Sequence, residues 1–171
     1  AYEFLIKQGT VISKSFLNSI LVTFMGTALG IMVTVLLAYT ISRKELVGRK
    51  LIMLFVFFTM LFNGGMVPTY LMYTQIFHIK NTMWALLFPH LLVNGFNVLL
   101  VRTFFNENIP EVLLEAARID GAGEISIFRN VVLPISKPIL ATIGLLVGVG
   151  YWNDWYNGLL FVTDVNYYTL Q

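Results

Sequence analysis

Long apolar stretches without charge alternate with short charged clusters along the chain. Uncharged stretches of 28, 29 and 21 residues follow Lys14, Lys50 and Lys80, and a fourth stretch of 16 residues follows Lys137. A helix needs about 20 mostly apolar residues to cross a hydrocarbon core of about 30 Å. The pattern predicts an all-α membrane protein, a polytopic helical bundle with four transmembrane helices in a single domain. The expected spans cover residues 15–41, 47–66, 82–105 and 138–160.

The second stretch does not predict one clean helix. Its apolar run, residues 51–62, would be only about 18 Å long as a helix, and Asn63, Gly64, Gly65 and Pro68 then interrupt it. One interpretation is a broken span whose backbone lines a cavity, as in some transporters. The simpler interpretation is a helix end followed by a short interfacial helix over residues 68–77.

The distribution of Lys and Arg predicts the orientation of these spans. Eight basic residues lie in the loop 42–50 or between residues 102 and 137, whereas the opposite side carries three. Because basic residues concentrate in cytoplasmic loops, we expect 42–50 and 106–137 to be cytoplasmic and both ends of the chain to face outward. The chain starts without Met or a basic leader, so we expect a fragment that lacks at least one preceding span.

Composition narrows the possible functions. Hydrophobic residues make up 57% of the chain and charged residues 12%, about half of the roughly 25% of a soluble domain. A net charge of +2 disfavours nucleic acid as a partner, and membrane lipid is the expected surrounding. The absence of cysteine excludes thiolate chemistry, and two separated histidines are too few for a metal site, so we expect none.

The segment 106–137 is the only long polar stretch and is expected to be structured. Pro110 suits the first turn of a helix, Glu111 suits its positive end, and Gly121 suits its end. A second short helix is expected over residues 124–132, with Pro134 ending it. Two helices joined at a glycine corner would form a rigid elbow on the membrane surface.

A gapped motif in this segment resembles the EAA loop of permeases from ATP-binding-cassette (ABC) importers. The motif comprises Glu115-Ala116-Ala117, Gly121, Val131 and Leu133-Pro134, with Val131 where the family commonly has isoleucine. Further stretches resemble the carbohydrate-type, MalG-like permeases: Asn18-Ser19, Ala38-Tyr39, Ser42-Arg43, Gly48-Arg49-Lys50, Asn81-Thr82, Ile119-Asp120-Gly121-Ala122, Trp152-Asn153 and Thr169-Leu170. Residues 62–70 are similar to the LplC-like and YtcP-like branch for complex oligosaccharides.

The resemblance implies a type I (MetI-like) permease fold. It also implies that this chain forms part of the membrane subunit while separate partner subunits bind ATP. The elbow would be a coupling helix that docks onto a cytoplasmic ATPase, through Glu115, Ala116, Ala117, Asp120, Gly121, Ala122, Leu133 and Pro134. The chain has no Gly-x4-Gly-Lys-Ser/Thr phosphate loop, so it is not expected to be an enzyme and has no cofactor of its own. ATP and Mg would bind two partner ATPase subunits in a bacterial cytoplasmic (inner) membrane.

The family pattern also implies a second homologous permease in a pseudo-twofold heterodimer and an external solute-binding protein. One further span is expected before this chain and one after it. The alternative from the broken second segment is a secondary transporter that works without ATP. A membrane enzyme or a plain assembly subunit are further alternatives, although no base and nucleophile cluster is evident.

Five polar residues are candidates for a sugar pathway. His90, Asn94 and Asn97 would share one face of a continuous third span, since their spacing is i, i+4 and i+7. Hydrogen bonding between helices explains the same residues equally well. At the end of the fourth span, Asn153 and Asp154 lie among aromatic residues that suit either sugar stacking or an interfacial aromatic belt.

Overall fold

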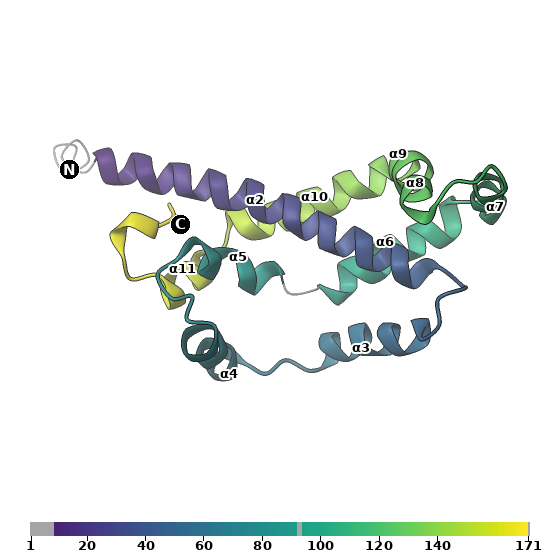
Figure 1. Ribbon diagram of the computed structural model, residues 1–171. Helices are drawn as coiled ribbons and strands as arrows, with labels where there is room; N and C mark the ends of the chain where they lie inside the picture. The colour runs from purple at the N-terminus through teal and green to yellow at the C-terminus, as the bar shows by residue number, and fades with distance from the viewer. Residues whose placement is uncertain (1–8, 92–93, 171) are drawn as a thin grey trace. The chain divides into compact units, whose positions relative to one another are not determined.

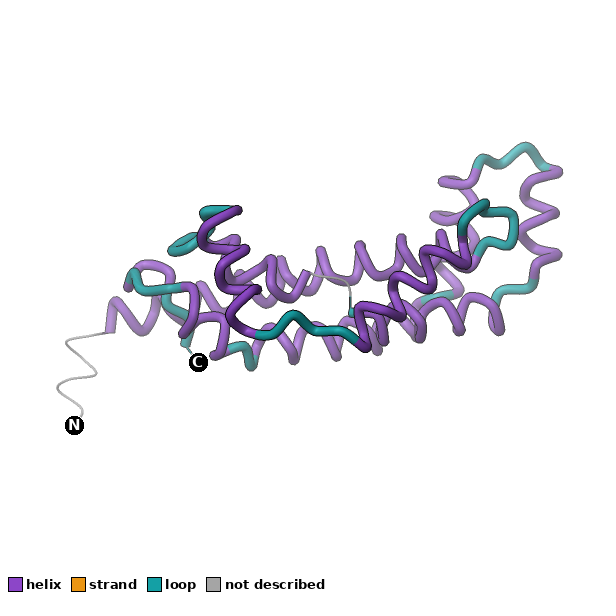
Figure 2. Tube along the Cα trace, turned by 90° about the horizontal axis from the view of Figure 1, so that it is seen from below, coloured by secondary structure: helices purple, strands orange, loops and turns teal. Residues whose placement is uncertain are grey.

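The computed structural model describes residues 9–91 and 94–170, and over these residues the chain is helical, without a strand (Figure 2). Figure 1 labels the elements, with α2 in purple and α11 in yellow. The elements are α2 (Gly9–Ser42), α3 (Arg49–Leu61), α4 (Met66–Leu71), η1 (Met72–Ile76), α5 (Met83–Leu91), α6 (Gly95–Asn108), α7 (Glu111–Ile119), α8 (Glu124–Ile127), η2 (Phe128–Val132), α9 (Leu133–Ile135), α10 (Lys137–Trp152), α11 (Trp155–Phe161) and η3 (Val165–Tyr167).

The described chain forms two compact units. Unit 1 comprises residues 1–30, 63–92 and 146–171, of which residues 1–8, 92 and 171 are not described, and unit 2 comprises 31–62 and 93–145, of which residue 93 is not described. Two of the boundaries fall inside α2 and α10, and a third falls at the Asn63-Gly64-Gly65 break after α3. The expectation of a single permease domain stays a prediction.

Two small apolar cores occur among the described residues of unit 1. In the first, Tyr151 packs with Val22, Leu86, Leu87 and Val162. The Tyr151 hydroxyl donates a hydrogen bond of 2.9 Å to the Leu87 carbonyl oxygen, so the polar end of this buried ring has a partner. In the second core, Tyr73, Ala85 and Phe161 bring together η1, α5 and α11.

In unit 2, α3 packs closely against α6 at Gly95. A Cβ at this position would lie 2.5 Å from the Met60 Cγ and 3.0 Å from the Val56 carbonyl oxygen. Only glycine permits this approach of the two helices. Farther along α6, the side chains of Val98, Val101 and Phe105 are buried.

One described helix, α2, is long and apolar enough to cross a membrane by itself. Its 34 residues contain a single charged side chain, Lys14. Two helix pairs would qualify if each pair were counted as one span: α3 with residues 66–76, and residues 124–135 with α10. Short helices follow the Asn63-Gly64-Gly65 break, as both interpretations of the second stretch allow. Four membrane crossings stay a prediction.

The expectation of a continuous third helix over residues 82–105 is wrong. Helix α5 contains Pro89, which cannot donate a backbone hydrogen bond, and it ends at Leu91. A separate helix, α6, begins at Gly95. The Asn94 side chain accepts a hydrogen bond of 3.2 Å from the Asn97 backbone N–H and caps the new helix.

The fourth predicted span, 138–160, is interrupted in the same way. Helix α10 ends at Trp152, and α11 begins at Trp155 after a turn at Asn153 and Asp154. The Asp154 carboxylate accepts hydrogen bonds from the backbone and the side-chain amide of Asn157, at 3.2 and 2.8 Å. A short acceptor side chain therefore starts a new helix inside a stretch that hydrophobicity alone predicts to be continuous.

The second elbow helix extends beyond its predicted end. Helical conformation continues from Glu124 to Ile135, and Pro134 lies in the first turn of α9 instead of ending the helix. The preceding turn, Phe128–Val132, is a wider π-helical turn. In a regular α-helix the Pro134 ring would clash with the carbonyl four residues earlier, and the wider turn relieves that clash.

Candidate coupling surface

The corner of the elbow is a glycine-terminated helix end. Gly121 has φ +79°, in the left-handed region. Its backbone N–H donates to the Arg118 carbonyl oxygen at 3.0 Å, and the Ala122 N–H donates to that of Ala117 at 2.9 Å. These two bonds form a Schellman motif, which satisfies carbonyl groups at the end of α7. The motif residues Ala117, Gly121 and Ala122 therefore set the geometry of the corner.

Helix α7 presents an apolar surface and two exposed glutamates, Glu111 and Glu115. Of its nine residues only Leu114 is buried. Ile119 is 86% exposed and Val112 is 72% exposed, and both share a helical face with exposed Leu113 and Ala116. Glu115 is also exposed. Exposed apolar surface of this kind, with a charged residue at its edge, is typical of a surface that binds another protein.

Ion pairs fasten the elbow to the end of α2. Arg118 bridges two carboxylates: its Nη1 lies 2.8 Å from the Glu45 Oε1, and its Nε donates to the Glu124 Oε1 at 2.9 Å. The Tyr39 hydroxyl donates to the other oxygen of Glu124 at 2.8 Å. The start of α7 is held by Lys44, whose Nζ lies 2.6 Å from the Glu111 Oε2. Both ends of α7 are thus tied to residues 39–45.

These contacts change the titration of Glu45. A hydrogen bond from its own backbone N–H, and then the hydrogen bond from Arg118, lower the pKa of the Glu45 carboxyl below its usual value of 4.5. Both interactions favour the ionised form. Glu45 therefore keeps its charge, and its bond to Arg118, throughout the neutral range.

The remaining motif residues lie along the same elbow. Asp120 is the exposed residue after α7, and its backbone N–H donates to the Ala116 carbonyl oxygen at 3.0 Å. Leu133 is half-buried and Pro134 is exposed, and both belong to α9. The predicted coupling residues all lie in unit 2, on α7, its corner and α9.

The candidate pathway residues do not form the expected helical face. Asn94 and Asn97 belong to unit 2, where Asn94 is an exposed cap and Asn97 is buried. His90 falls in α5 of unit 1, and its side chain lies outside the described part of the structure. The structure therefore brings Asn94 and Asn97 together at one helix start.

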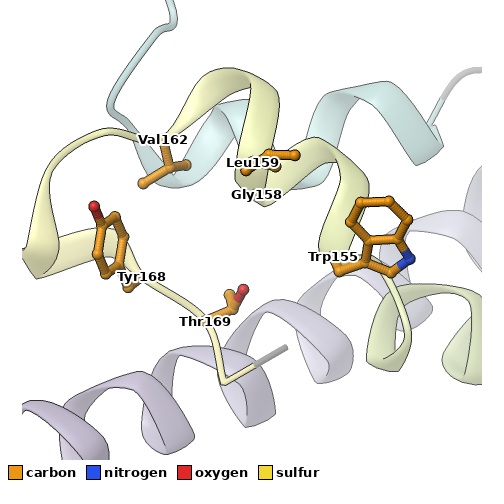
Figure 3. Close-up of a pocket in the computed structure, with 6 residues that line it drawn as sticks. All are labelled: Trp155, Gly158, Leu159, Val162, Tyr168 and Thr169. Carbon is orange, nitrogen blue, oxygen red and sulfur yellow. The ribbon is translucent and has the colours of Figure 1, made fainter.

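Asn153 and Asp154 lie at the turn between α10 and α11 in unit 1. The Asn153 side-chain amide donates to the Val149 carbonyl oxygen at 2.9 Å, and Asp154 caps α11. After this turn, residues 155–169 enclose a pocket of about 320 Å³ (Figure 3). It is lined by Trp155, Gly158, Leu159, Val162, Tyr168 and Thr169.

Sequence stretches far apart in the chain meet around this pocket. The Asn18 amide donates to the carbonyl oxygens of Asn166 and Tyr168 at 3.0 and 3.1 Å. The Leu170 N–H donates to the Ser19 hydroxyl oxygen at 2.8 Å. The two dipeptides Asn18-Ser19 and Thr169-Leu170 thus belong to one arrangement, in which α2 holds the segment after η3.

Tyr39, Arg118 and Glu124 are positioning residues that sequence reasoning left out of the candidate site. They orient the elbow through side-chain bonds. Arg118 lies between the Glu-Ala-Ala triplet and Gly121, and Tyr39 belongs to a stretch that resembles the carbohydrate-type permeases. Their location in or beside these motifs could have marked Arg118 and Tyr39 as candidates. No sequence spacing predicts that residues 39 and 124 bond to each other.

Comparison with known proteins decides the family. Residues 26–168 match the family described as "Binding-protein-dependent transport system inner membrane component". The chain belongs to this family. The match includes the elbow and its Schellman corner, and the family description agrees with an inner-membrane location.

Two curated relatives come from Bacillus subtilis (strain 168). The chain is 40% identical over its full length to "Polygalacturonan/rhamnogalacturonan transport system permease protein YtcP" and 39% identical over its full length to "Protein LplC". It covers 58% and 57% of these proteins. The chain therefore spans a little more than half the length of the curated relatives that it matches.

The fold agrees with a solved transporter structure. The chain aligns with a TM-score of 0.88 and 30% identity to a protein chain in "Crystal structure of a bacterial ABC transporter involved in the import of the acidic polysaccharide alginate". The alignment covers 94% of this chain and 56% of that one. The all-helical permease fold expected from the sequence is confirmed.

Proposed function

We propose that this chain is part of a permease subunit of an ATP-driven importer, with α7 as the helix that couples it to an ATPase. The observation that carries the proposal is α7 itself, which buries one side chain and exposes an apolar surface beside Glu115. Ion pairs hold both ends of α7 to Lys44 and Glu45 in the loop after α2, so a displacement of α7 would be transmitted to that loop. Family membership supports the same role.

The partners follow from this role. A second homologous permease, two cytoplasmic ATPase subunits and an external solute-binding protein would complete the importer. ATP and Mg would bind the ATPase subunits, because this chain lacks a phosphate loop. Loops 42–50 and 106–137 would then lie on the cytoplasmic side of a multi-pass protein, in keeping with their basic residues.

Oligosaccharides are the proposed substrate class, and acidic ones in particular. The name of one relative specifies polygalacturonan and rhamnogalacturonan transport, and the transporter of the matched crystal structure is involved in alginate import. The proposed pathway residues are His90, Asn94, Asn97, Asn153 and Asp154. Amide groups at helix starts can exchange hydrogen bonds with sugar hydroxyl groups, and nothing favours an ion-driven secondary transporter.

The coupling role is tested by reversing one charge on α7. In the full-length protein, assembled with its partners in proteoliposomes, Glu115→Lys is expected to lower ATP-dependent uptake of an oligogalacturonide more than ten-fold, because it places a repulsive charge in the docking surface. Glu107→Lys is the matched control, since Glu107 is an exposed glutamate of α6 outside the elbow. Equal uptake by the two variants would overturn the coupling assignment.

The pathway role of Asn94 needs a variant that keeps its cap. Asn94→Ser retains an oxygen that can accept from the Asn97 N–H, whereas Asn94→Leu removes it. If the amide contacts sugar, both variants reduce uptake. If Asn94 acts only as a cap, the Asn94→Ser variant imports sugar normally and only the Asn94→Leu variant is impaired. That result would show that Asn94 has a structural role and no contact with sugar.

A further inference from the structure

The loop between α2 and α3 carries a basic groove, and of its residues only Lys44 also takes part in the proposed coupling surface. A groove of about 340 Å³ is lined by Lys44, Leu46, Gly48, Arg49 and Lys50. Three of these five residues are cations and none is an acid. A neighbouring cavity of about 410 Å³ has mixed charge, because Glu45, Glu107 and Glu111 line it together with basic residues.

Two of the three cations in the groove have no acidic partner among the residues that the structure describes. Lys44 is paired with Glu111 at 2.6 Å. Arg49 and Lys50 take part in no described ion pair. Arg49 also lines the neighbouring cavity that holds the three glutamates, but it forms no described ion pair with them. Two cations that share a groove without ion-pair partners attract an anion.

The apolar surface beside the groove limits what the anion can be. Val47, within the loop, is 95% exposed. Leu51, Leu54, Phe55 and Phe58 are exposed on α3 at spacing i, i+3, i+4 and i+7, so they form one stripe that begins directly after Lys50. The opposite side of α3 packs on α6 through Val56. The stripe is therefore the face of α3 that points away from α6.

We propose that Arg49 and Lys50, with Lys44, bind the phosphate headgroup of an anionic phospholipid whose acyl chains lie along the stripe on α3. A single ligand with an anionic head and apolar tails matches both features. Basic residues directly beside membrane-crossing helices bind anionic lipids of the cytoplasmic leaflet. The inference rests on the proposed cytoplasmic side of loop 42–50, but not on the substrate or on ATPase docking.

The test counts lipids bound to the full-length permease assembled with its partners, using native mass spectrometry with phosphatidylglycerol and phosphatidylcholine. The unchanged complex is expected to retain phosphatidylglycerol preferentially. A cation near the membrane surface changes anionic lipid binding about five-fold, so Arg49→Gln with Lys50→Gln should lower this preference roughly 30-fold. Arg129→Gln with Lys137→Gln is the control, because it removes two exposed cations of the same predicted side outside the groove.

Several outcomes would overturn the inference. An unchanged preference in the Arg49 and Lys50 double variant would show that the groove does not select lipid. Displacement of the bound lipid by soluble glycerol phosphate would show that the groove takes a free phosphate group and that the stripe plays no part. If the double variant lost an ATPase subunit but bound lipid as before, the groove would be a contact with a protein and not a lipid site.

Folding and function are checked separately. The exchange Arg49→Lys with Lys50→Arg keeps both charges and should keep the preference, so a loss there would point to misfolding. Uptake measured on the same preparations separates the two proposals. A complex that imports sugar without preferring phosphatidylglycerol contradicts the lipid site alone, whereas a lipid-selective complex without ATP-dependent uptake contradicts the proposed function alone.

Discussion

Gly121 determines where α7 ends and how the elbow turns. A Cβ at this position would meet no atom within 4 Å, so the requirement for glycine is conformational rather than steric. Its φ of +79° costs an L-residue roughly 1–2 kcal/mol. Gly121 lies at C′ of the Schellman motif, and Ala117, the last residue of the Glu-Ala-Ala triplet, lies at C3.

Gly121→Ala is therefore expected to weaken the elbow by about 1 kcal/mol. Hydrogen exchange at the Ala122 amide, whose N–H closes the motif, should become roughly five-fold faster. Gly123→Ala is the matched control, because Gly123 has φ −72° and open space around a Cβ. Equal effects of both substitutions would contradict the conformational explanation.

Glu45 gives the elbow a predictable dependence on pH. Because its pKa is lower in the folded protein than the usual 4.5, the stabilisation by its hydrogen bonds is complete above about pH 4.5 and is lost as the pH falls through the lowered pKa. An exposed pair of this kind contributes roughly 0.2–1 kcal/mol.

In Arg118→Gln the Glu45 pKa should rise only part of the way back, since the bond to its own backbone N–H remains. Carboxyl NMR titration of the labelled complex measures this shift. An unchanged Glu45 pKa in Arg118→Gln would contradict the ion pair.

At the scale of elements, hydrophobicity predicts the helical regions but not their interruptions. Residues 82–105 and 138–160 are apolar enough to suggest continuous spans, yet Asn94 and Asp154 cap new helices inside them. The sequence does not show whether the side chain of a single Asn or Asp in an apolar run bonds to a neighbouring helix or to a nearby backbone N–H group. The break after Phe62 was predictable because three signals, Asn63, Gly64 and Gly65, occur together.

The crossing of α3 and α6 depends on the absence of a side chain at Gly95. Gly95→Ala is expected to destabilise unit 2 by roughly 1–3 kcal/mol, because the new Cβ would press on the Met60 side chain and the Val56 backbone oxygen. In the control variant Gly150→Ala on α10, the new Cβ would meet no atom within 4 Å, so the stability of the protein should be unchanged or increased. Thermal unfolding of the two purified variants measures the difference, and equal melting temperatures would contradict this close packing.

At the scale of the whole molecule, the charged residues show how the chain is organised. Most of the basic residues occur in the loop 42–50 or between residues 102 and 137, and the structure joins these segments through Lys44, Glu45, Glu111, Arg118 and Glu124. The sequence identifies the elbow by its motif. It does not predict which side chains secure the elbow, since pairs 67 and 73 residues apart depend on the tertiary fold.

The same limit applies to the segment after α11. Asn81 accepts hydrogen bonds from the backbone N–H groups of Thr163 and Asp164 at 2.6 and 3.2 Å, and Asn18 and Ser19 hold residues 166–170. Asn81, Asn18, Ser19 and Leu170 lie in family-like stretches, but each bonds to a residue more than 80 positions away in the chain. Family resemblance shows that such residues matter, and only the fold shows that they bond to one another.

Site-specific cross-linking tests the central claim most directly. The chain has no cysteine, so Ile119→Cys places one thiol on the most exposed large hydrophobic side chain of α7. Val47→Cys places one in the loop proposed to face lipid. With a short bifunctional reagent on the assembled complex, the thiol at position 119 is predicted to cross-link to an ATPase subunit and the thiol at position 47 is not. Absence of an ATPase cross-link from position 119, in a complex that still imports sugar, would contradict α7 as the coupling helix.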